Sequence, residues 1–137
     1  MKRVLFDTDV VLDVLLQRQP YFPASALALD QVGQDKVEGY IAGHAITNLF
    51  YLLRRHLGSA QSREVLVKLM SKMRVAAVTD AVVREALSSP FPDFEDAVAH
   101  AAAKAVGTEA IVTRNLKDFR NGTVPAMLPE VFLATLN

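Results

Sequence analysis

Short apolar runs alternate with longer segments of helical period throughout this chain. The runs of strand length, each mostly apolar, lie at about 3–6, 39–42, 75–78 and 110–113. A weaker fifth run at about 124–127 is interrupted by Pro125, which a central strand does not tolerate. Strands that alternate with helices pair in parallel, because a parallel connection needs a crossover segment. The chain is therefore predicted to be α/β, with a central parallel sheet of four to five strands.

Start and stop signals divide the segments between these strands into helices. The predicted helices cover about 9–17, 24–34, 44–56, 60–72, 80–87 and 93–107, and a short terminal helix begins at Pro129. Gly58 separates the third helix from the fourth, and a Pro-Phe-Pro break precedes Asp93. No repeat, linker or low-complexity tract interrupts the pattern, so we expect one domain over residues 1–137.

The composition excludes several kinds of protein. A chain of 137 residues with 51% hydrophobic and 22% charged residues is typical of a compact globule. The absence of cysteine excludes disulfides, thiolate metal sites and cysteine nucleophiles. Fifteen basic residues balance fifteen acidic ones, so nucleic-acid binding would depend on local basic patches. Acids interrupt the apolar stretch near the amino terminus, and no uncharged apolar segment reaches ~18 residues, so we expect a cytoplasmic protein with no membrane partner.

Acidic residues follow the first predicted strand directly. Asp7-Thr8-Asp9 comes after the apolar residues Val4-Leu5-Phe6. In open α/β sheets the ligand crevice lies beyond the carboxyl ends of the strands, and carboxylate oxygens are the ligands that hard cations prefer. One of these acids could serve only to cap the helix that follows. A cap needs one acid, however, and this turn supplies two, so we expect a cation site here.

A second acidic cluster opens the alanine-rich helix predicted at 93–107. Asp93 and Asp96 lie one helical turn apart and so share a side of this helix. Acids in the first turn of a helix are also favoured by the helix dipole without any function. The cluster is therefore a candidate half of a metal site, with helix capping as the alternative.

A third polar cluster, at 113–118, follows the fourth predicted strand. Its oxygen donors Asn115 and Asp118 could complete a cation site. Its cations Arg114 and Lys117 could contact a phosphodiester, because guanidinium and ammonium groups are the usual phosphate ligands. An ordinary turn with exposed charges is the alternative. Together the three clusters predict a Mg²⁺ or Mn²⁺ site that serves phosphodiester hydrolysis by an activated water.

Four segments carry a resemblance to a known family. They occur in the order LFDTDVVLDVLL, AITNLFYLLRR, DFEDAVAHAAA and IVTRNLKDF. By these segments the chain resembles the PIN-domain family over essentially its whole length, particularly the bacterial branch that includes the toxin ribonucleases of toxin-antitoxin pairs. The resemblance implies a three-layer α/β/α Rossmann-like fold and Mg²⁺-dependent or Mn²⁺-dependent cleavage of single-stranded RNA. It also implies a homodimer and a small antitoxin protein as partner.

The resemblance also implies which residues act. Asp7 matches the first catalytic acid of the family, Asp96 the third and Asp118 the fourth. The second acid is usually a glutamate in the third helix, where this chain has Asn48; an amide oxygen can bind a cation but brings no charge, and Asp9 could restore the missing charge. The expected metal ligands are Asp7, Asp9, Asn48, Asp93, Asp96, Asn115 and Asp118, supported by Thr8 and Thr113, with Arg114 and Lys117 binding the substrate.

Other families share part of the pattern. Asp-x-Asp-x-Val after a strand also resembles the nucleophile motif of haloacid-dehalogenase-like phosphatases, in which Asp7 would be phosphorylated and Asp9 would act as acid/base. A receiver-like phosphoacceptor would need an aspartate at the end of its third strand, where Thr79-Asp80 is an imperfect match. A third alternative keeps the PIN fold without the reaction, as a module that binds RNA or protein, and Asn48 is its best support.

The helix predicted at 44–56 carries two further features. Its residues Leu49, Phe50, Leu52 and Leu53 make it apolar over more than one face, which favours a partner such as a second copy or an antitoxin. Arg54-Arg55-His56 is interpreted as a solvated helix end, with contact to an RNA backbone as the alternative. Elsewhere, His100 is expected to be exposed or partly packed rather than a metal ligand.

Overall fold

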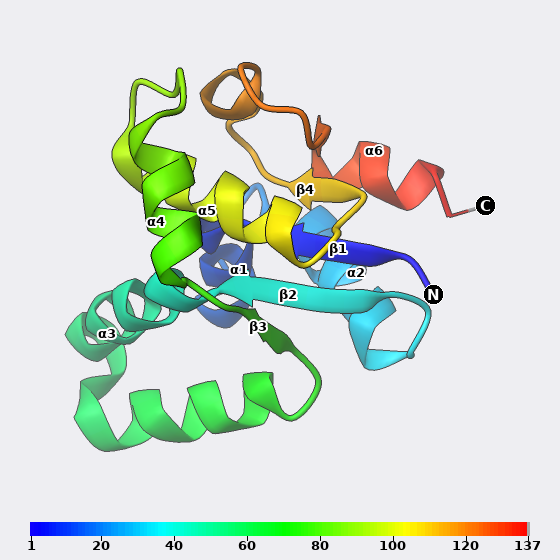
Figure 1. Cartoon of the computed structure of the whole chain (residues 1–137). Helices are drawn as coiled ribbons and strands as arrows, with labels where there is room; N and C mark the ends of the chain where they lie inside the picture. The colour runs from blue at the N-terminus through cyan, green and yellow to red at the C-terminus, as the bar shows by residue number, and fades with distance from the viewer. Residues whose placement is uncertain (137) are drawn as a thin grey trace.

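Five parallel strands form the centre of the structure, a computed structural model that describes residues 1–136 (Figure 1). The strand order is β3-β2-β1-β4-β5. The elements are β1 (Arg3–Phe6), α1 (Thr8–Leu15), α2 (Phe22–Gly33), β2 (Glu38–Ala42), α3 (Gly43–Met70), β3 (Arg74–Ala76), α4 (Asp80–Leu87), α5 (Phe94–Ala105), β4 (Ala110–Val112), the 3-10 helix η1 (Leu116–Phe119), β5 (Ala126–Met127) and α6 (Pro129–Ala134). The predicted α/β class and parallel sheet are confirmed.

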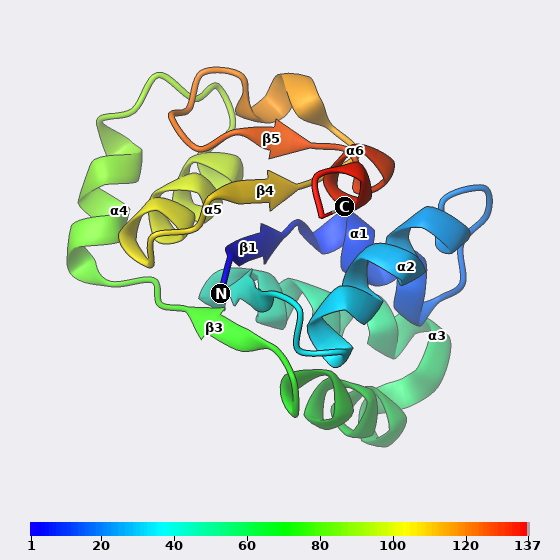
Figure 2. The same ribbon diagram turned by 90° about the vertical axis from the view of Figure 1, so that its right-hand side faces the viewer.

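The helices cover both faces of the sheet and so make three layers. α1, α2, α3 and α6 lie on one face, and α4 and α5 lie on the other (Figure 2). The chain runs from β1 outward to β3, then crosses back to β4, so the crossovers fall on opposite faces in its two halves. Among the described residues, no helix is both long enough and apolar enough to cross a membrane.

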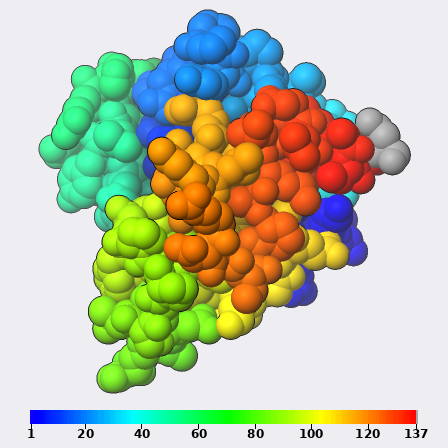
Figure 3. Space-filling view, turned by 90° about the horizontal axis from the view of Figure 1, so that it is seen from above, coloured from blue at the N-terminus to red at the C-terminus, as the bar shows by residue number. Residues whose placement is uncertain are grey.

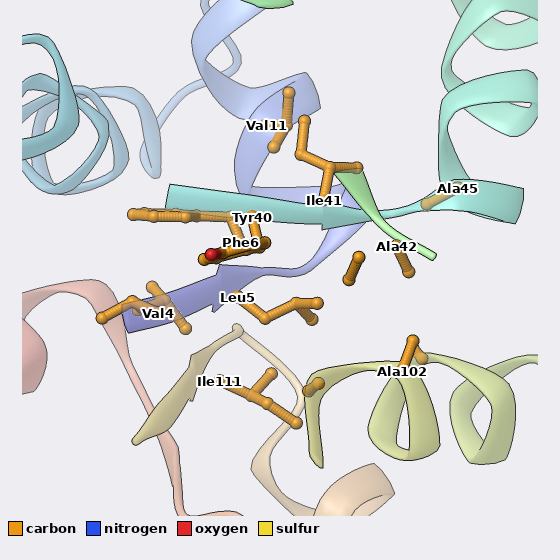
Figure 4. Packing of buried hydrophobic residues seen from close by; sticks show 14 of the residues in the cluster. Val4, Leu5, Phe6, Val11, Tyr40, Ile41, Ala42, Ala45, Ala102 and Ile111 are labelled. Atoms are coloured by element: carbon orange, nitrogen blue, oxygen red, sulfur yellow. The ribbon is translucent and has the colours of Figure 1, made fainter. Parts of the chain in front are cut away.

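Buried apolar residues of the central strands hold the layers together. Val4, Leu5 and Phe6 of β1 are almost completely buried, as expected for a parallel strand covered on both faces. In the same core, Val11 from α1 and Ala102 from α5 meet the residues of β1, β2 and β4 (Figure 4). β1 is thus fixed at the centre of the sheet, and the residue that follows it is held at the carboxyl edge.

Side-chain caps start three of the helices. The Asp7 carboxylate accepts a hydrogen bond from the backbone N–H of Thr8 (2.9 Å), and Asp93 accepts one from the backbone N–H of Asp96 (3.0 Å). Thr79 begins α4 in the same way. Helix capping, the alternative considered for these acids, is therefore real. It occupies one oxygen of Asp7 and one of Asp93.

The regions around Gly58 and Pro125 both follow the prediction from the sequence. α3 spans Gly43–Met70, but Gly58 (φ 77°, ψ 170°) is not helical and divides it into two helical segments, in agreement with the two helices predicted on either side of this glycine. Gly58 adopts the positive φ that glycine tolerates, so the helix bends without an intervening loop. β5 is confirmed but short, and Pro125 is tolerated because it takes part only through its carbonyl oxygen, which accepts from the Ile111 N–H (2.8 Å).

Candidate active site

A cavity of about 490 Å³ lies at the carboxyl edge of the sheet. Its lining brings together residues far apart in the sequence, namely Asp7, Thr8, Asp9, Asn48, Tyr51, Leu52, Arg55, Glu95, Asp96, Asn115 and Asp118. In the view from above, the segment after β4 lies in orange between the red α6 and the yellow-green α4–α5 connection (Figure 3). All three predicted catalytic acids, Asp7, Asp96 and Asp118, line this one cavity.

A chain of hydrogen bonds joins the first and third polar clusters. The Thr113 hydroxyl donates to Asp7 Oδ2 (2.8 Å) and accepts from the backbone N–H of Asn115 (3.0 Å). The Asn115 side-chain amide in turn donates to Asp9 Oδ2 (2.9 Å). Thr113 therefore supports Asp7, as the sequence suggested, and Asn115 orients Asp9. Each carboxylate keeps lone pairs for a further partner.

The first turn of α5 supplies a second group of carboxylates. Ligand oxygens of Asp93, Glu95 and Asp96 all lie within 4.8 Å of one another. Asp96 and Glu95 line the cavity, whereas Asp93 is exposed and lies outside the lining. Asp93 caps α5 through one oxygen, as Asp7 caps α1, and it is the one predicted metal ligand that lies outside the cavity lining.

The crowding of acids changes their pKa values. Burial, together with the nearby charges of Asp9 and Glu95, raises the pKa of Asp7 to about 6, against the opposing hydrogen bond from Thr113. Burial and the adjoining Glu95 carboxyl raise the pKa of Asp96 to about 8. The ionised forms of Asp7 and Asp96 are thus disfavoured when no cation is bound.

Glu95 is a site residue that the sequence reasoning missed. The His44 Nε2 atom lies 3.0 Å from Glu95 Oε1 and 3.2 Å from the Glu95 backbone oxygen. This hydrogen bond from His44 lowers the pKa of Glu95, despite partial burial. His44 comes shortly after the end of β2, and Glu95 lies in the first turn of α5. The argument that selected Asp7, that polar residues at strand ends and helix starts meet at the carboxyl edge of the sheet, could therefore also have indicated this pair.

Asn48 lies in the cavity wall, on α3, as expected for the second family position. Its side chain is exposed and carries no charge. The carboxylates of the lining follow β1 or lie on α1, α5 and η1, so α3 contributes an amide but no carboxylate.

The two predicted substrate-binding cations lie elsewhere. The Arg114 guanidinium donates to both oxygens of the buried Asp13 (2.7 and 3.3 Å) and stacks 3.8 Å from the ring centroid of Tyr21. Lys117 is exposed and does not line the cavity. Among the residues that the structure describes, Arg55 on α3 is the one Lys or Arg in the lining. The sequence offered no sign that Asp13 would engage Arg114.

His100 is buried, more deeply than the sequence reasoning expected. Its Nε2 atom accepts a hydrogen bond from the backbone N–H of Val124 (3.1 Å), and its ring lies 4.9 Å from that of Phe91. Burial, with help from the charge of Lys104, lowers the pKa of His100. The imidazole is therefore a neutral structural group that anchors the segment before β5.

The donor set of the cavity fits a hard divalent cation. Carboxylate and amide oxygens line it, and within residues 1–136 no imidazole or thioether does. Oxygen donors of this kind suit Mg²⁺ and Mn²⁺ rather than the softer transition metals.

Comparison with known proteins decides between the candidate families. A sequence profile of the PIN domain matches residues 3–117, most of the chain. The chain belongs to the PIN-domain family. This membership confirms the resemblance and removes the phosphatase alternative. The receiver alternative also fails on strand order, because receiver domains have the order 2-1-3-4-5. None of the curated proteins matches the sequence.

This PIN domain has the fold of solved structures to which its sequence is only distantly similar. A toxin-antitoxin complex from Klebsiella pneumoniae matches at a TM-score of 0.69 and 20% identity, over 92% of this chain and 97% of that one. VapBC-1 from nontypeable Haemophilus influenzae matches at 0.69 and 13%, over 93% and 98%. VapC20 from Mycobacterium tuberculosis, a sarcin-ricin loop cleaving toxin, matches at 0.61 and 15%, over 79% and 86%. These matches establish the three-layer α/β/α fold.

Proposed function

We propose that this PIN domain is a ribonuclease that hydrolyses phosphodiester bonds of single-stranded RNA with the help of Mg²⁺ or Mn²⁺. The observation that carries the proposal is the convergence of three acids on one cavity: Asp7 directly after β1, Asp96 on α5 and Asp118 on η1. The raised pKa values of Asp7 and Asp96 support it, because such crowding is unfavourable without a cation.

The donors named above divide into charged and neutral ligands. Asp7, Asp96 and Asp118 would hold the ion, with oxygens of Asp9, Asn48 and Asn115 beside them. A bound divalent ion would polarise the phosphoryl group, lower the pKa of the attacking water and stabilise the leaving oxygen.

The chain itself supplies orientation and proton acceptors. Thr113 fixes the Asp7 carboxylate, and Asn115 fixes Asp9, so two acids are preorganised before RNA binds. In hydrolysis the water oxygen bonds to phosphorus while the bond from phosphorus to the ribose oxygen breaks. A carboxylate of the cavity takes one proton from the attacking water, and the leaving ribose oxygen takes up a proton from a second water, so that it is released as a hydroxyl.

We propose further that the protein is the toxin of a toxin-antitoxin pair, with a small antitoxin protein and a second copy of itself as partners. Similarity of fold to toxin-antitoxin complexes supports this role. Elution as a clean monomer in size-exclusion chromatography would count against the dimer.

The second candidate is a PIN module that binds RNA without cutting it. Asn48 favours it, because the donor set lacks the acid that the family usually has on this helix. Both candidates share the cavity, and they differ in whether products form.

A cleavage assay with metal titration separates the two. End-labelled single-stranded RNA is incubated with the protein after EDTA treatment, and Mg²⁺ or Mn²⁺ is then added back. The ribonuclease predicts products that require the metal and vanish in Asp7→Asn, while the matched surface variant Glu64→Gln cleaves normally. Binding without metal and without products would establish the module instead.

A further inference from the structure

One face of α3 runs from the acidic cavity outward to the surface. Asn48, Tyr51, Leu52 and Arg55 follow the i, i+3, i+4, i+7 spacing of a single helix face, and all four line the cavity. The helix rise places Arg55 about 10 Å along the axis from Asn48. Tyr51, Leu52 and Arg55, here called the α3 strip, therefore continue the cavity away from the acids.

The α3 strip combines an exposed aromatic ring with an available cation. Tyr51 is 53% exposed, although an aromatic side chain is usually buried in a core. Within residues 1–136, Arg55 takes part in none of the ion pairs, in contrast to Arg114 on Asp13. A second guanidinium, that of Arg54, lies 5.3 Å from the centroid of the Tyr51 ring.

We propose that the α3 strip binds the RNA strand where it leaves the cavity, with a base stacked on Tyr51 and a backbone phosphate on Arg55. The proposal rests on the proposed function and assigns substrate contacts to residues of the cavity lining, which includes neither Arg114 nor Lys117.

Two physical arguments favour RNA as the occupant. A polyanion brought to a cavity of carboxylates meets repulsion, and Arg55 is the cation in the lining that offsets it. Exposed aromatic rings beside cations are the usual platform for single strands, because every base has a face that can stack. A duplex cannot offer its bases to Tyr51, so the α3 strip selects for single strands.

RNA affinity measured in a non-cleaving background tests the proposal. All proteins carry Asp7→Asn, and binding of a fluorescein-labelled single-stranded RNA pool is followed by anisotropy at several salt concentrations. Tyr51→Ala should weaken binding roughly 5-fold to 100-fold, with recovery in Tyr51→Trp. Arg55→Ala should weaken binding and reduce the slope of log affinity against log salt by about 1.

Matched variants and a metal titration complete the test. Arg63→Ala and Val67→Ala remove a cation and an exposed apolar side chain from α3 beyond the kink, and both should bind RNA like the background. In the otherwise wild-type protein, Tyr51→Ala and Arg55→Ala should keep the Mn²⁺ affinity measured by calorimetry, because neither removes an acidic donor.

The outcomes separate this inference from the proposed function. If wild-type protein forms no products but the α3 variants lose RNA affinity, the α3 strip binds RNA as proposed and the protein is an RNA-binding module rather than a ribonuclease. If wild-type protein cleaves RNA and both α3 variants bind it like their background, the inference is wrong and the face is left for a protein partner. Failure of the background to bind RNA at all would also overturn it.

Discussion

The Asp13 carboxylate, with no exposed surface, accepts two hydrogen bonds from the guanidinium of Arg114 across a separation of 101 residues. Arg18 donates to the same carboxylate (3.0 Å). Because Arg114 immediately precedes Asn115, the pair ties the loop that carries the last site residues to α1. A buried ion pair here fixes the position of a loop.

Loss of Arg114 should therefore cost stability. Arg114→Ala leaves Asp13 buried with one cation, and we expect the free energy of unfolding to fall by about 2–4 kcal/mol. Arg114→Lys should recover only part of this loss, because an ammonium cannot reproduce the two-pronged contact. Urea denaturation measures both, with exposed Arg120→Ala as the control. An unchanged stability combined with a reduced salt dependence of RNA binding would show that Arg114 contacts phosphate after all.

Stability of the metal-free protein should depend on pH through Asp7 and Asp96. The folded pKa values, about 6 and about 8, lie above the ~3.9 of an unfolded aspartate. The folded state therefore holds protons more tightly, and the stability these groups contribute is lost as pH rises through about 6 and then about 8. Denaturation in EDTA at several pH values measures the slope.

Removing one of these charges should flatten that slope. Asp7→Asn should be more stable than wild type at pH ~8.5 by about 1 kcal/mol and lose activity, a common trade-off at functional sites. Glu64→Gln, which removes an exposed acid from α3, should behave like wild type. Equal slopes in Asp7→Asn and wild type would argue against charge crowding in the cavity.

A carboxylate at position 48 should strengthen metal binding. Asn48→Glu adds a charge to the oxygen donors, and we expect Mn²⁺ to bind about tenfold more tightly by calorimetry. Asn48→Ala should abolish cleavage. Thr47→Glu is the control, because it adds the same charge at the preceding residue of α3, which does not line the cavity. If neither change at position 48 alters binding or cleavage, Asn48 does not belong to the site.

Gly39 should be sensitive to any side chain. A Cβ atom there would lie 2.6 Å from Val32 Cγ2 and 2.8 Å from Met73 Sδ, because α2 packs directly on β2. Gly39→Ala should lower the free energy of unfolding by about 1–3 kcal/mol. Gly33→Ala, whose Cβ would meet only Asp30 at 3.7 Å, should be neutral or slightly stabilising. Thermal unfolding of the two variants checks the contrast.

Local pattern was sufficient for most of the fold. The hydrophobic periodicity and the residues that start and stop helices predicted the bounds of β1, β2 and α4 to within about a residue. These signals depend only on residues close together in the sequence. η1 was not predicted, whereas the break at Gly58 was predicted and divides α3 into two helical segments. Glycine readily adopts the positive φ found at this break, so a single residue was enough to predict it.

The sequence by itself determined the α/β class, the parallel sheet and the acids at its carboxyl edge. Residues close together in the sequence specify where strands end and helices start. Only the tertiary structure decided which groups meet across the sheet. It brought Glu95 to His44, committed Arg114 to Asp13 and left Arg55 facing the cavity. Such pairings depend on side-chain direction and burial across distant elements, which no local spacing encodes.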